Sequence, residues 1–186
     1  MLKNQLLGYS GLLKNTSNLN LAFLYKNSIT VDSAYSILDD YDYVFAGRTP
    51  FVIDLNYNGM NISLLNNHFK CCGDGELDLN DSSDEEYRRL ISNQLLEEYV
   101  NDTYPNKRVV ILGDLNDSLT DEEEHNVFWN FLNSDLFLFA DYSIANGTSS
   151  NWSFPGWPSH IDHILISNEL FLDYENSDIL TFKIDD

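Results

Sequence analysis

The chain has 186 residues, with 30 acidic side chains against 10 basic ones and a formal net charge of -20 at pH 7. Its length is that of one domain, and its 43% hydrophobic and 13% aromatic content supplies a single core and excludes intrinsic disorder. The charge excludes a general nucleic-acid coat, because binding by counterion release needs clustered Lys and Arg. A phosphate-bearing partner therefore needs a cation at a local site. No apolar run approaches the roughly 20 residues of a membrane span.

The N-terminal segment and the cysteines say little about the compartment. Residues 1–13 lack the charged and apolar regions of a signal peptide. The localisation stays open, with secretion or another place outside the cytoplasm as an alternative for the full-length protein. Cys71 and Cys72 are adjacent, which excludes the CxxC spacing of metal sites. Free thiols are favoured over a disulfide between neighbours, which would be strained.

The first half of the chain predicts β-strands. Residues 19–31 are rich in apolar and aromatic side chains. Residues 50–57 alternate, which places one set of side chains on a common face: Phe51, Ile53, Leu55 and Tyr57. The Asn58-Gly59 pair predicts a tight turn into a partner strand at residues 62–69.

Two capping boxes predict helices farther along. Ser83 with Glu86 precedes apolar residues at helical spacing, namely Tyr87, Leu90, Ile91, Leu95 and Tyr99. Thr120 with Glu123 precedes Val127, Phe128 and Phe131. The uniformly apolar residues 109–112 predict a strand covered on both faces, and residues 160–166 predict a last strand. This mixture of strands, helices and a hairpin predicts a layered α+β architecture.

Three polar clusters lie at the ends of predicted buried strands. They are Asn66-Asn67-His68, Gly113-Asp114-Leu115-Asn116-Asp117 and Ser159-His160-Ile161-Asp162-His163. Asp114 follows four apolar residues and a glycine, so its carboxylate is expected at a strand mouth, where it can act as a general base or metal ligand. The alternative is an Asx turn in which Asp114 and Asn116 only bind backbone NH groups.

His68 and Asp162 carry further alternatives. His68 shares a strand face with Ile62 and Leu64, so it can equally be a core histidine bonded to a carbonyl. Asp162 alternates with Ile164 and Ile166, which predicts a buried carboxylate. A buried carboxylate needs a donor such as an imidazole.

In this order, the clusters resemble the endonuclease/exonuclease/phosphatase superfamily of deoxyribonuclease I-like proteins. Gly47-Arg48-Thr49-Pro50-Phe51 resembles its Arg-x-Pro segment, and Asn66-Asn67-His68 its strand-end histidine motif. Gly113-Asp114-Leu115-Asn116 resembles its G-D-x-N signature, and Ile161-Asp162-His163-Ile164 its Ile-Asp-(Tyr/His)-Ile strand. The runs from Asn67 to Gly75 and from Trp152 to His160 resemble bacterial members. The resemblance implies a four-layer α/β/β/α sandwich, incomplete in this chain.

The resemblance also implies roles for particular residues. Asp114 would orient or deprotonate the attacking water, and Asn116 would position it or contact the phosphate. Asp114 and Asn116 would hold Mg²⁺, with Mn²⁺ and Ca²⁺ as alternatives. His68 and Arg48 would hold phosphoryl oxygens, with Asn66 also contacting the substrate. Asp162 would orient a catalytic histidine.

Two parts of the family pattern are not matched. The family has a metal-binding Asn and Glu on two earlier strands and a Ser-Asp-His motif after the last strand matched here. The first glutamate of this chain is Glu76, and no histidine follows His163. Residues 1–13 resemble the helix after the family's glutamate. Residues 1–186 are therefore expected to be one internal fragment of a longer hydrolase domain, with little hydrolysis of bis(p-nitrophenyl) phosphate on its own.

Two loops allow alternative interpretations. Trp152 and Trp157, in the loop before the last strand, either stack a base or sugar or anchor the loop to the core. An acidic series in the loop before the first predicted helix has oxygen ligands near calcium-loop spacing but lacks the glycine at position six. It consists of Asp74, Glu76, Asp78, Asn80, Ser82 and Glu85. A solvated charge run is the alternative to calcium binding.

The sequence thus favours a metal-dependent phosphoester hydrolase of the nuclease or phosphatase type. A phosphodiester or phosphomonoester is the expected partner, with nucleic acid, sugar phosphates and lipid head groups left open, and a monomer is expected. The alternatives are a non-catalytic phosphate-binding pseudoenzyme and a calcium-stabilised binding module.

Overall fold

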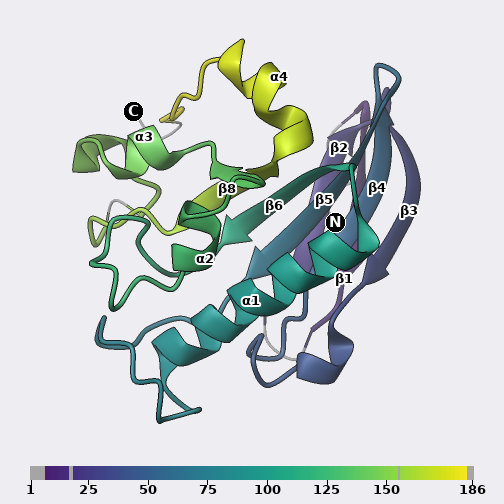
Figure 1. The fold of residues 1–186 in the computed structure, drawn as a ribbon. Helices are drawn as coiled ribbons and strands as arrows, with labels where there is room; N and C mark the ends of the chain where they lie inside the picture. The colour runs from purple at the N-terminus through teal and green to yellow at the C-terminus, as the bar shows by residue number, and fades with distance from the viewer. Residues whose placement is uncertain (1–6, 17–18, 155, 184–186) are drawn as a thin grey trace.

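The computed structural model describes residues 7–16, 19–154 and 156–183 (Figure 1). The strands are β1 (Tyr9–Lys14), β2 (Leu21–Lys26), β3 (Thr30–Ser36), β4 (Phe51–Tyr57), β5 (Met60–His68), β6 (Arg108–Asp114), β7 (Phe137–Phe139) and β8 (Asp162–Ser167). The α-helices are α1 (Glu85–Thr103), α2 (Trp129–Leu132), α3 (Tyr142–Ala145) and α4 (Phe171–Glu175). Short 3-10 turns occur at Asp39–Tyr41, Ser149–Asn151 and Asn168–Leu170.

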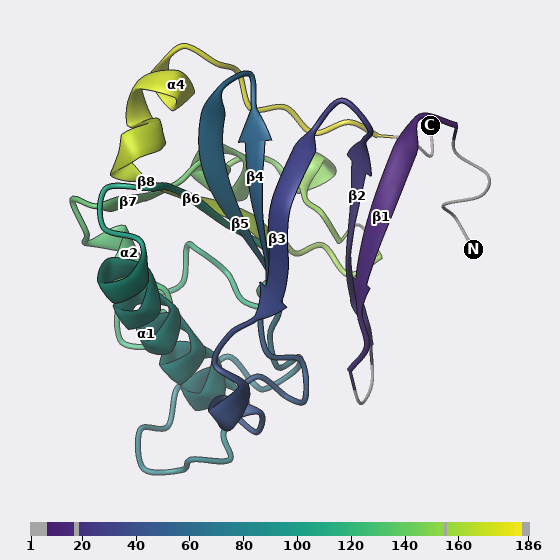
Figure 2. The same cartoon turned by 90° about the vertical axis from the view of Figure 1, so that its right-hand side faces the viewer.

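Two sheets form the framework. The larger is six-stranded in the order β3-β4-β5-β6-β8-β7, and β1 and β2 form a separate antiparallel pair. Within the larger sheet only the β5–β6 pair is parallel. Figure 2 shows α1 on one face of this sheet and β1 and β2 on the other. The predicted α+β sandwich is confirmed in incomplete form, since the described part of the second sheet has two strands.

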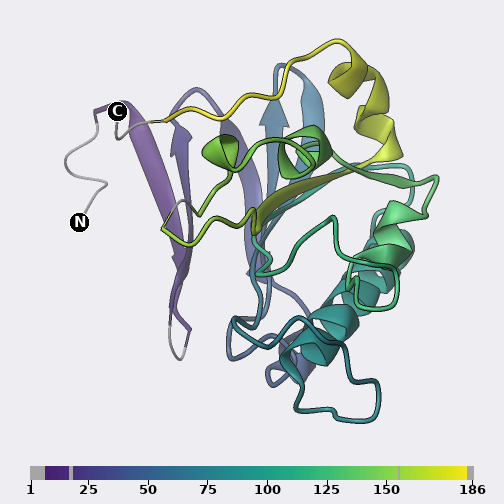
Figure 3. The same ribbon diagram turned by 90° about the vertical axis from the view of Figure 1, so that its left-hand side faces the viewer.

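The core lies between the large sheet and α1. Strand register places five buried side chains in one row across the sheet: Val52, Leu65, Ile111, Leu165 and Phe139, each at most 3% exposed. Leu96 and Val100 of α1 belong to the same core cluster, as does Phe131 of α2, which lies beside α1 (Figure 3). Full burial of one such side chain contributes roughly 1.5–3 kcal/mol, so this row fixes the strand register.

The predicted strands are largely confirmed. Asn58 and Gly59 both have positive φ, 51° and 84°, and connect β4 to β5 as the predicted tight turn. Residues 19–31, expected as one strand, are divided between β2 and β3. A turn at Asn27 and Ser28, closed by a 2.9 Å hydrogen bond from Ile29 N to Lys26 O, separates them.

The start of α1 differs from the prediction by one residue. Asp84, not Ser83, is the N-cap, and its Oδ1 accepts from the Tyr87 backbone N at 2.6 Å. The Ser83 hydroxyl instead donates to Asp81. The buried face is rotated from the predicted stripe and includes Arg89, Ser92, Asn93, Leu96 and Val100. The predicted residues Leu90, Leu95 and Tyr99 are only partly buried against the core, because the inner face also carries polar side chains that bind loop carbonyls.

Two other predicted helices are wrong. Within residues 1–13, Tyr9 to Leu13 form part of strand β1, paired with β2, and residues 1–6 lie outside the described residues. No helix begins at Thr120, and α2 begins only at Trp129. Asn126 holds the intervening turns, because its side chain donates to Leu119 O and accepts from Phe128 N. Over the described ranges, no helix has the length and apolar composition to cross a membrane.

Candidate active site

His68, Asp114 and Asp162 lie side by side on three neighbouring strands. His68 pairs with Asp114 across the parallel β5–β6 pair, and Asp114 pairs with Asp162 across the antiparallel β6–β8 pair. Paired residues on adjacent strands point to the same face of a sheet. The sheet therefore brings three of the four predicted catalytic side chains into one row, at the ends of three inner strands.

This row opens into a cavity of about 910 Å³. Six of the eight predicted site residues line it: His68, Asp114, Asn116, Asp162, Trp152 and Trp157. The loops after β5 and β6, the loop before β8, and Glu86 and Arg89 of α1 form much of the remaining wall. The volume is in the range of small-molecule sites.

The backbone after β6 turns sharply to form the site. Gly113 has φ +131°, and a Cβ at this position would collide with the carbonyl oxygen of Asn67. Asn116 adopts a left-handed conformation (φ 56°), and its N donates to Asp114 Oδ1 at 3.2 Å. The Asx turn considered from the sequence is thus present. It uses only Oδ1 and leaves Asp114 Oδ2 facing His68 Nε2 at 3.6 Å.

The electrostatics of the row favour a cation. Burial, and after it the negative charge of Asp162, raise the pKa of Asp114 to about 6. Burial and then the positive charge of Arg48 lower the pKa of His68. His68 is therefore favoured as a neutral imidazole, and the described residues place no hydrogen-bond partner on its ring.

Asp162 is exposed, so the predicted burial is wrong. On β8 the buried face carries His163 and Leu165, whereas Ile164, which shares a face with Asp162, is 42% exposed. The described strands of the second sheet do not cover this part of β8. Within the described ranges no side chain donates a hydrogen bond to the Asp162 carboxylate, and its backbone N donates to Ser153 Oγ at 3.1 Å.

Arg48 and Asn66 do not line the cavity. Arg48 is 6% exposed, and its guanidinium donates to His68 O at 3.0 Å and to Phe69 O at 2.7 Å. It thereby braces the end of β5 that carries His68. Asn66 donates to Ala22 O at 3.0 Å and links the two sheets. A direct substrate contact by either residue stays a prediction.

The two tryptophans of the loop are placed differently. Trp152 is partly buried, and its indole N donates to Ile144 O at 3.2 Å, as expected of an anchor. Trp157 is 76% exposed at the cavity, so its ring face is available. This geometry is compatible with both of the roles considered for the loop.

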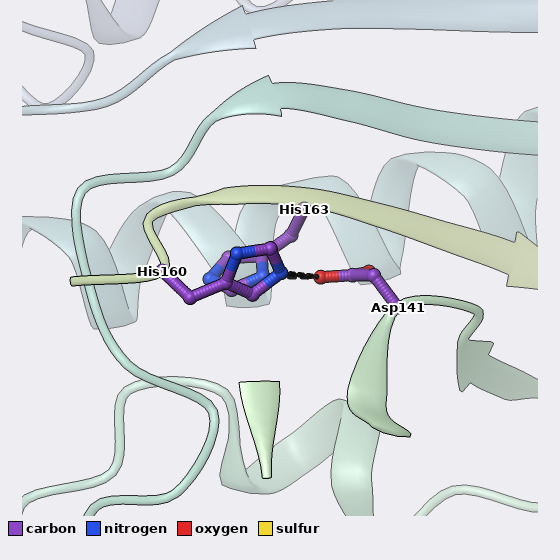
Figure 4. A group of neighbouring side chains, drawn as sticks. All are labelled: Asp141, His160 and His163. Carbon is purple, nitrogen blue, oxygen red and sulfur yellow. Dashed lines mark hydrogen bonds and ion pairs between the residues drawn. The ribbon is translucent and has the colours of Figure 1, made fainter. Parts of the chain in front are cut away.

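A buried cluster beside the cavity was missed in the sequence. Asp141 Oδ2 accepts from His163 Nδ1 at 2.7 Å and from His160 Nε2 at 2.8 Å (Figure 4). Its Oδ1 accepts from Ile164 N at 2.8 Å. Asp141 follows the apolar run at residues 136–140, and this position at the end of a strand was the available signal. The cluster ties β7 to the start of β8.

Both ring nitrogens of each histidine in this cluster have a partner. The second ring nitrogen of His163 lies 2.9 Å from the Asp117 carbonyl oxygen, so both of its nitrogens face acceptors. His160 Nδ1 accepts from Ser153 N, which leaves the proton on Nε2. Burial alone raises the pKa of Asp141, but hydrogen bonds from His160 and His163 outweigh it and hold the pKa well below its usual range. Asp141 is therefore ionised, and its two oxygens accept hydrogen bonds from both imidazoles and from the Ile164 backbone N.

Arg89 joins the two loops that frame the cavity. It is 2% exposed, pairs with Asp117 at 2.7 Å and with Glu86 at 2.8 Å, and donates to the carbonyls of Lys70 and Cys72. The loop after β5 is thereby fixed to the loop after β6. Cys71 and Cys72 are free thiols, as predicted.

The chain resembles known proteins in sequence pattern and in fold. The model of the Endonuclease/Exonuclease/phosphatase family matches residues 13–178. The fold is similar to D. rerio TDP2 complexed with single-strand DNA product (TM-score 0.66, 14% identity, covering 89% of this chain and 64% of that one). It is also similar to the human Nocturnin catalytic domain with bound sulfate (0.58, 16%, 87% and 61%). A third is the mannosyl-6-phosphatase of Bacteroides thetaiotaomicron (0.54, 16%, 89% and 65%).

At these identities the structures show the fold alone. The chain spans less than two thirds of the length of each of these three structures. No curated protein matched the chain in sequence. The predicted bacterial origin and the fragment boundaries stay predictions.

Proposed function

Because the chain belongs to the endonuclease/exonuclease/phosphatase family, we propose that its cavity takes part in metal-dependent hydrolysis of a phosphoester by water. The observation that carries the proposal is the cross-strand row of His68, Asp114 and Asp162 at the mouth of the 910 Å³ cavity. The row combines two carboxylates with an imidazole whose ring makes no hydrogen bond within the described residues and lies 3.6 Å from Asp114 Oδ2.

The donor set fits a hard divalent cation. Asp162 is the cross-strand partner of Asp114, and its negative charge helps to raise the pKa of Asp114, so a cation bound at Asp114 would relieve this repulsion. Asn116 donates to Phe69 O through Nδ2, which leaves its Oδ1 as a further oxygen ligand. Carboxylate and amide oxygens are the ligands that Mg²⁺ prefers, with Mn²⁺ and Ca²⁺ as alternatives. Asp114 and Asn116 would hold the ion, which when bound polarises the phosphoryl group.

The side chains of the row have distinct tasks in this proposal. Ionised Asp114 accepts a hydrogen bond from the attacking water and orients it. Neutral His68 donates to a phosphoryl oxygen, and Arg48 keeps this histidine in place through the His68 carbonyl. Asp162 would orient a catalytic histidine, as the resemblance implies.

The substrate is proposed to be a small phosphoester with a planar group. Trp157 offers an exposed ring at the cavity, and stacking on an aromatic ring contributes roughly 1–3 kcal/mol per base. The net charge of -20 disfavours tight binding of duplex DNA. Nucleotides, single-stranded nucleic acid ends and sugar phosphates remain within this class.

The test uses the full-length product of the gene that contains these residues. Hydrolysis of bis(p-nitrophenyl) phosphate and p-nitrophenyl phosphate is measured with Mg²⁺, Mn²⁺, Ca²⁺ or EDTA. Turnover that needs a divalent ion and falls at least about 100-fold in Asp114→Asn supports the proposal, a loss typical of a residue acting on the reacting water. A matched control is Asp135→Asn, an exposed carboxylate on the surface.

The rival function is binding without hydrolysis. Phosphate binding measured by calorimetry in Mg²⁺, together with no turnover of either ester, would identify a pseudoenzyme. Metal-dependent turnover that Asp114→Asn leaves unchanged would place the chemistry elsewhere in the protein.

A further inference from the structure

Three carboxylates meet where the loop after β5 folds back onto the start of α1. One oxygen each of Asp74, Asp84 and Glu86 lies within 4.8 Å of the others. Asp84 is the N-cap of α1, and Glu86 lies in its first turn. Asp74 stands between two glycines with positive φ, Gly73 and Gly75, which let the loop reach back to the helix.

Glu86 shows that this cluster is incomplete without a ligand. The residue is 2% exposed, and its Oε1 accepts from Gly75 N at 2.9 Å and from Arg89 at 2.8 Å. Its Oε2 is buried and has no hydrogen-bond partner among the described residues. A buried carboxylate oxygen without a donor is costly, so a ligand from outside the chain is needed to satisfy it.

The nearby cations do not balance the cluster. Arg89 is shared between Glu86 and Asp117, which is a further carboxylate. Lys70 pairs with Glu85 at 3.1 Å, not with the cluster. Among the described residues, the one ion pair of the cluster is thus that of Glu86 with Arg89, whose charge is also shared with Asp117.

We propose that Asp74, Asp84 and Glu86 bind a calcium ion that fastens the loop to α1. The ligands are all oxygens, and no imidazole or thiolate belongs to the cluster, which disfavours transition metals. Ca²⁺ accepts six to eight oxygens in flexible geometry, so loop carbonyls and water can complete its shell, whereas Mg²⁺ demands a near-ideal octahedron.

These ligands differ from the calcium ladder considered in the sequence. Of that series only Asp74 belongs to the cluster, because Glu76 pairs with His125, Glu85 pairs with Lys70, and Asp78 binds Asn80. Helix geometry selects Asp84 and Glu86 instead, since both lie at the start of α1 beside the returning loop.

The ion would stabilise one wall of the cavity without taking part in the reaction. Gly73, Gly75 and Glu86 line the cavity of the proposed active site. A calcium ion here holds these residues in place, and it is separate from the ion assigned to Asp114 and Asn116.

The test titrates EDTA-stripped protein with Ca²⁺ or Mg²⁺ alone, using calorimetry and thermal unfolding. The proteins are the wild type, Asp74→Asn and Asp84→Asn. Asn keeps the Asx turn at position 74 and is a good N-cap at position 84, so both variants are expected to fold. Asp78→Asn, an exposed residue of the same loop outside the cluster, is the matched control.

Ca²⁺ at about 100 times its Kd is expected to raise the Tm of the wild type and of Asp78→Asn by about 5–10 °C. Affinity for Ca²⁺ should fall at least about tenfold in Asp74→Asn and Asp84→Asn. An equal affinity in the wild type and both cluster variants, or no binding of Ca²⁺ to the wild type, overturns the site. Asp114→Asn should keep the calcium-dependent rise in Tm, so failure of the hydrolase proposal is distinguishable from failure of this one.

Discussion

Asp114 and Asp162 are direct cross-strand partners in the antiparallel pair β6–β8. Two carboxylates opposite each other repel, and this repulsion destabilises the metal-free sheet. Such an arrangement persists where a cation or a substrate uses it, as is common at active sites.

Replacing Asp114 should therefore stabilise the metal-free protein while it abolishes hydrolysis. Because the pKa of Asp114 is raised in the folded protein, folding favours its protonated form. The contribution of Asp114 to the free energy of unfolding is therefore fully present below pH 4 and is lost as pH rises through about 6. A shift of this size corresponds to about 3 kcal/mol. Because the side chain is 31% exposed, screening reduces the expected gain in Asp114→Asn to on the order of 1–2 kcal/mol at pH 8. Urea unfolding in EDTA at pH 4 and pH 8 measures it, and a variant less stable than wild type at pH 8 would contradict the repulsion.

Asp141 should be required for stability at neutral pH. Asp141→Asn weakens three hydrogen bonds that the carboxylate accepts from His160, His163 and Ile164 N. A hydrogen bond to a charged group contributes roughly 1.5–3 kcal/mol, so a total loss of about 3–5 kcal/mol is expected. The folded pKa of Asp141 lies below its unfolded value of about 3.9, so its stabilising effect is present above pH 4 and is lost as pH falls below it. The free-energy difference between wild type and Asp141→Asn should shrink from pH 7 to pH 3 in urea unfolding. Asp135→Asn is the exposed control, and a pH-independent difference would show that Asp141 is not ionised in the fold.

Arg89 should hold the two cavity loops together. Arg89→Ala removes the partner of both Glu86 and Asp117 and four hydrogen bonds, so a loss of about 3–5 kcal/mol is expected. Lys26→Ala, which removes an exposed cation, should change the free energy of unfolding by less than about 0.5 kcal/mol. Equal stabilities of the two variants would mean that Arg89 is dispensable.

Trp157 should affect substrate binding but not stability. It is 76% exposed, so Trp157→Ala should leave the Tm unchanged while raising KM for an aromatic phosphoester about 5- to 100-fold, as expected for loss of one stacking contact. Trp152→Ala should instead lower the Tm, because its indole anchors the loop to Ile144. If Trp157→Ala instead lowered the Tm and left the KM unchanged, Trp157 would be a packing residue like Trp152 and not a substrate contact.

The sequence predicted the parts of the fold that depend on local patterns. The Asn58-Gly59 turn and the apolar residues 109–112 led directly to β4, β5 and β6, since turn chemistry and burial on both faces leave clear signals. The position of Asp114 after a strand and a glycine also followed from local sequence. Together these features placed the row of His68 and Asp114.

Other features depended on contacts distant in sequence. Asp162 alternates with two isoleucines, but its face of β8 is exposed because no described strand covers it. Thr120 begins no helix, since the Asn126 side chain holds turns there. The cluster of Asp141, His160 and His163 joins two segments about 20 residues apart through side-chain hydrogen bonds, which no periodicity in the sequence reveals.

The most direct test of the central claim is the rate of bis(p-nitrophenyl) phosphate hydrolysis by the full-length gene product, measured in Mg²⁺ and in EDTA. The account predicts turnover only with the metal, a decrease of at least about 100-fold in Asp114→Asn and in His68→Ala, and full activity in Asp135→Asn. Turnover in EDTA, or wild-type activity in both variants of the row, would contradict it.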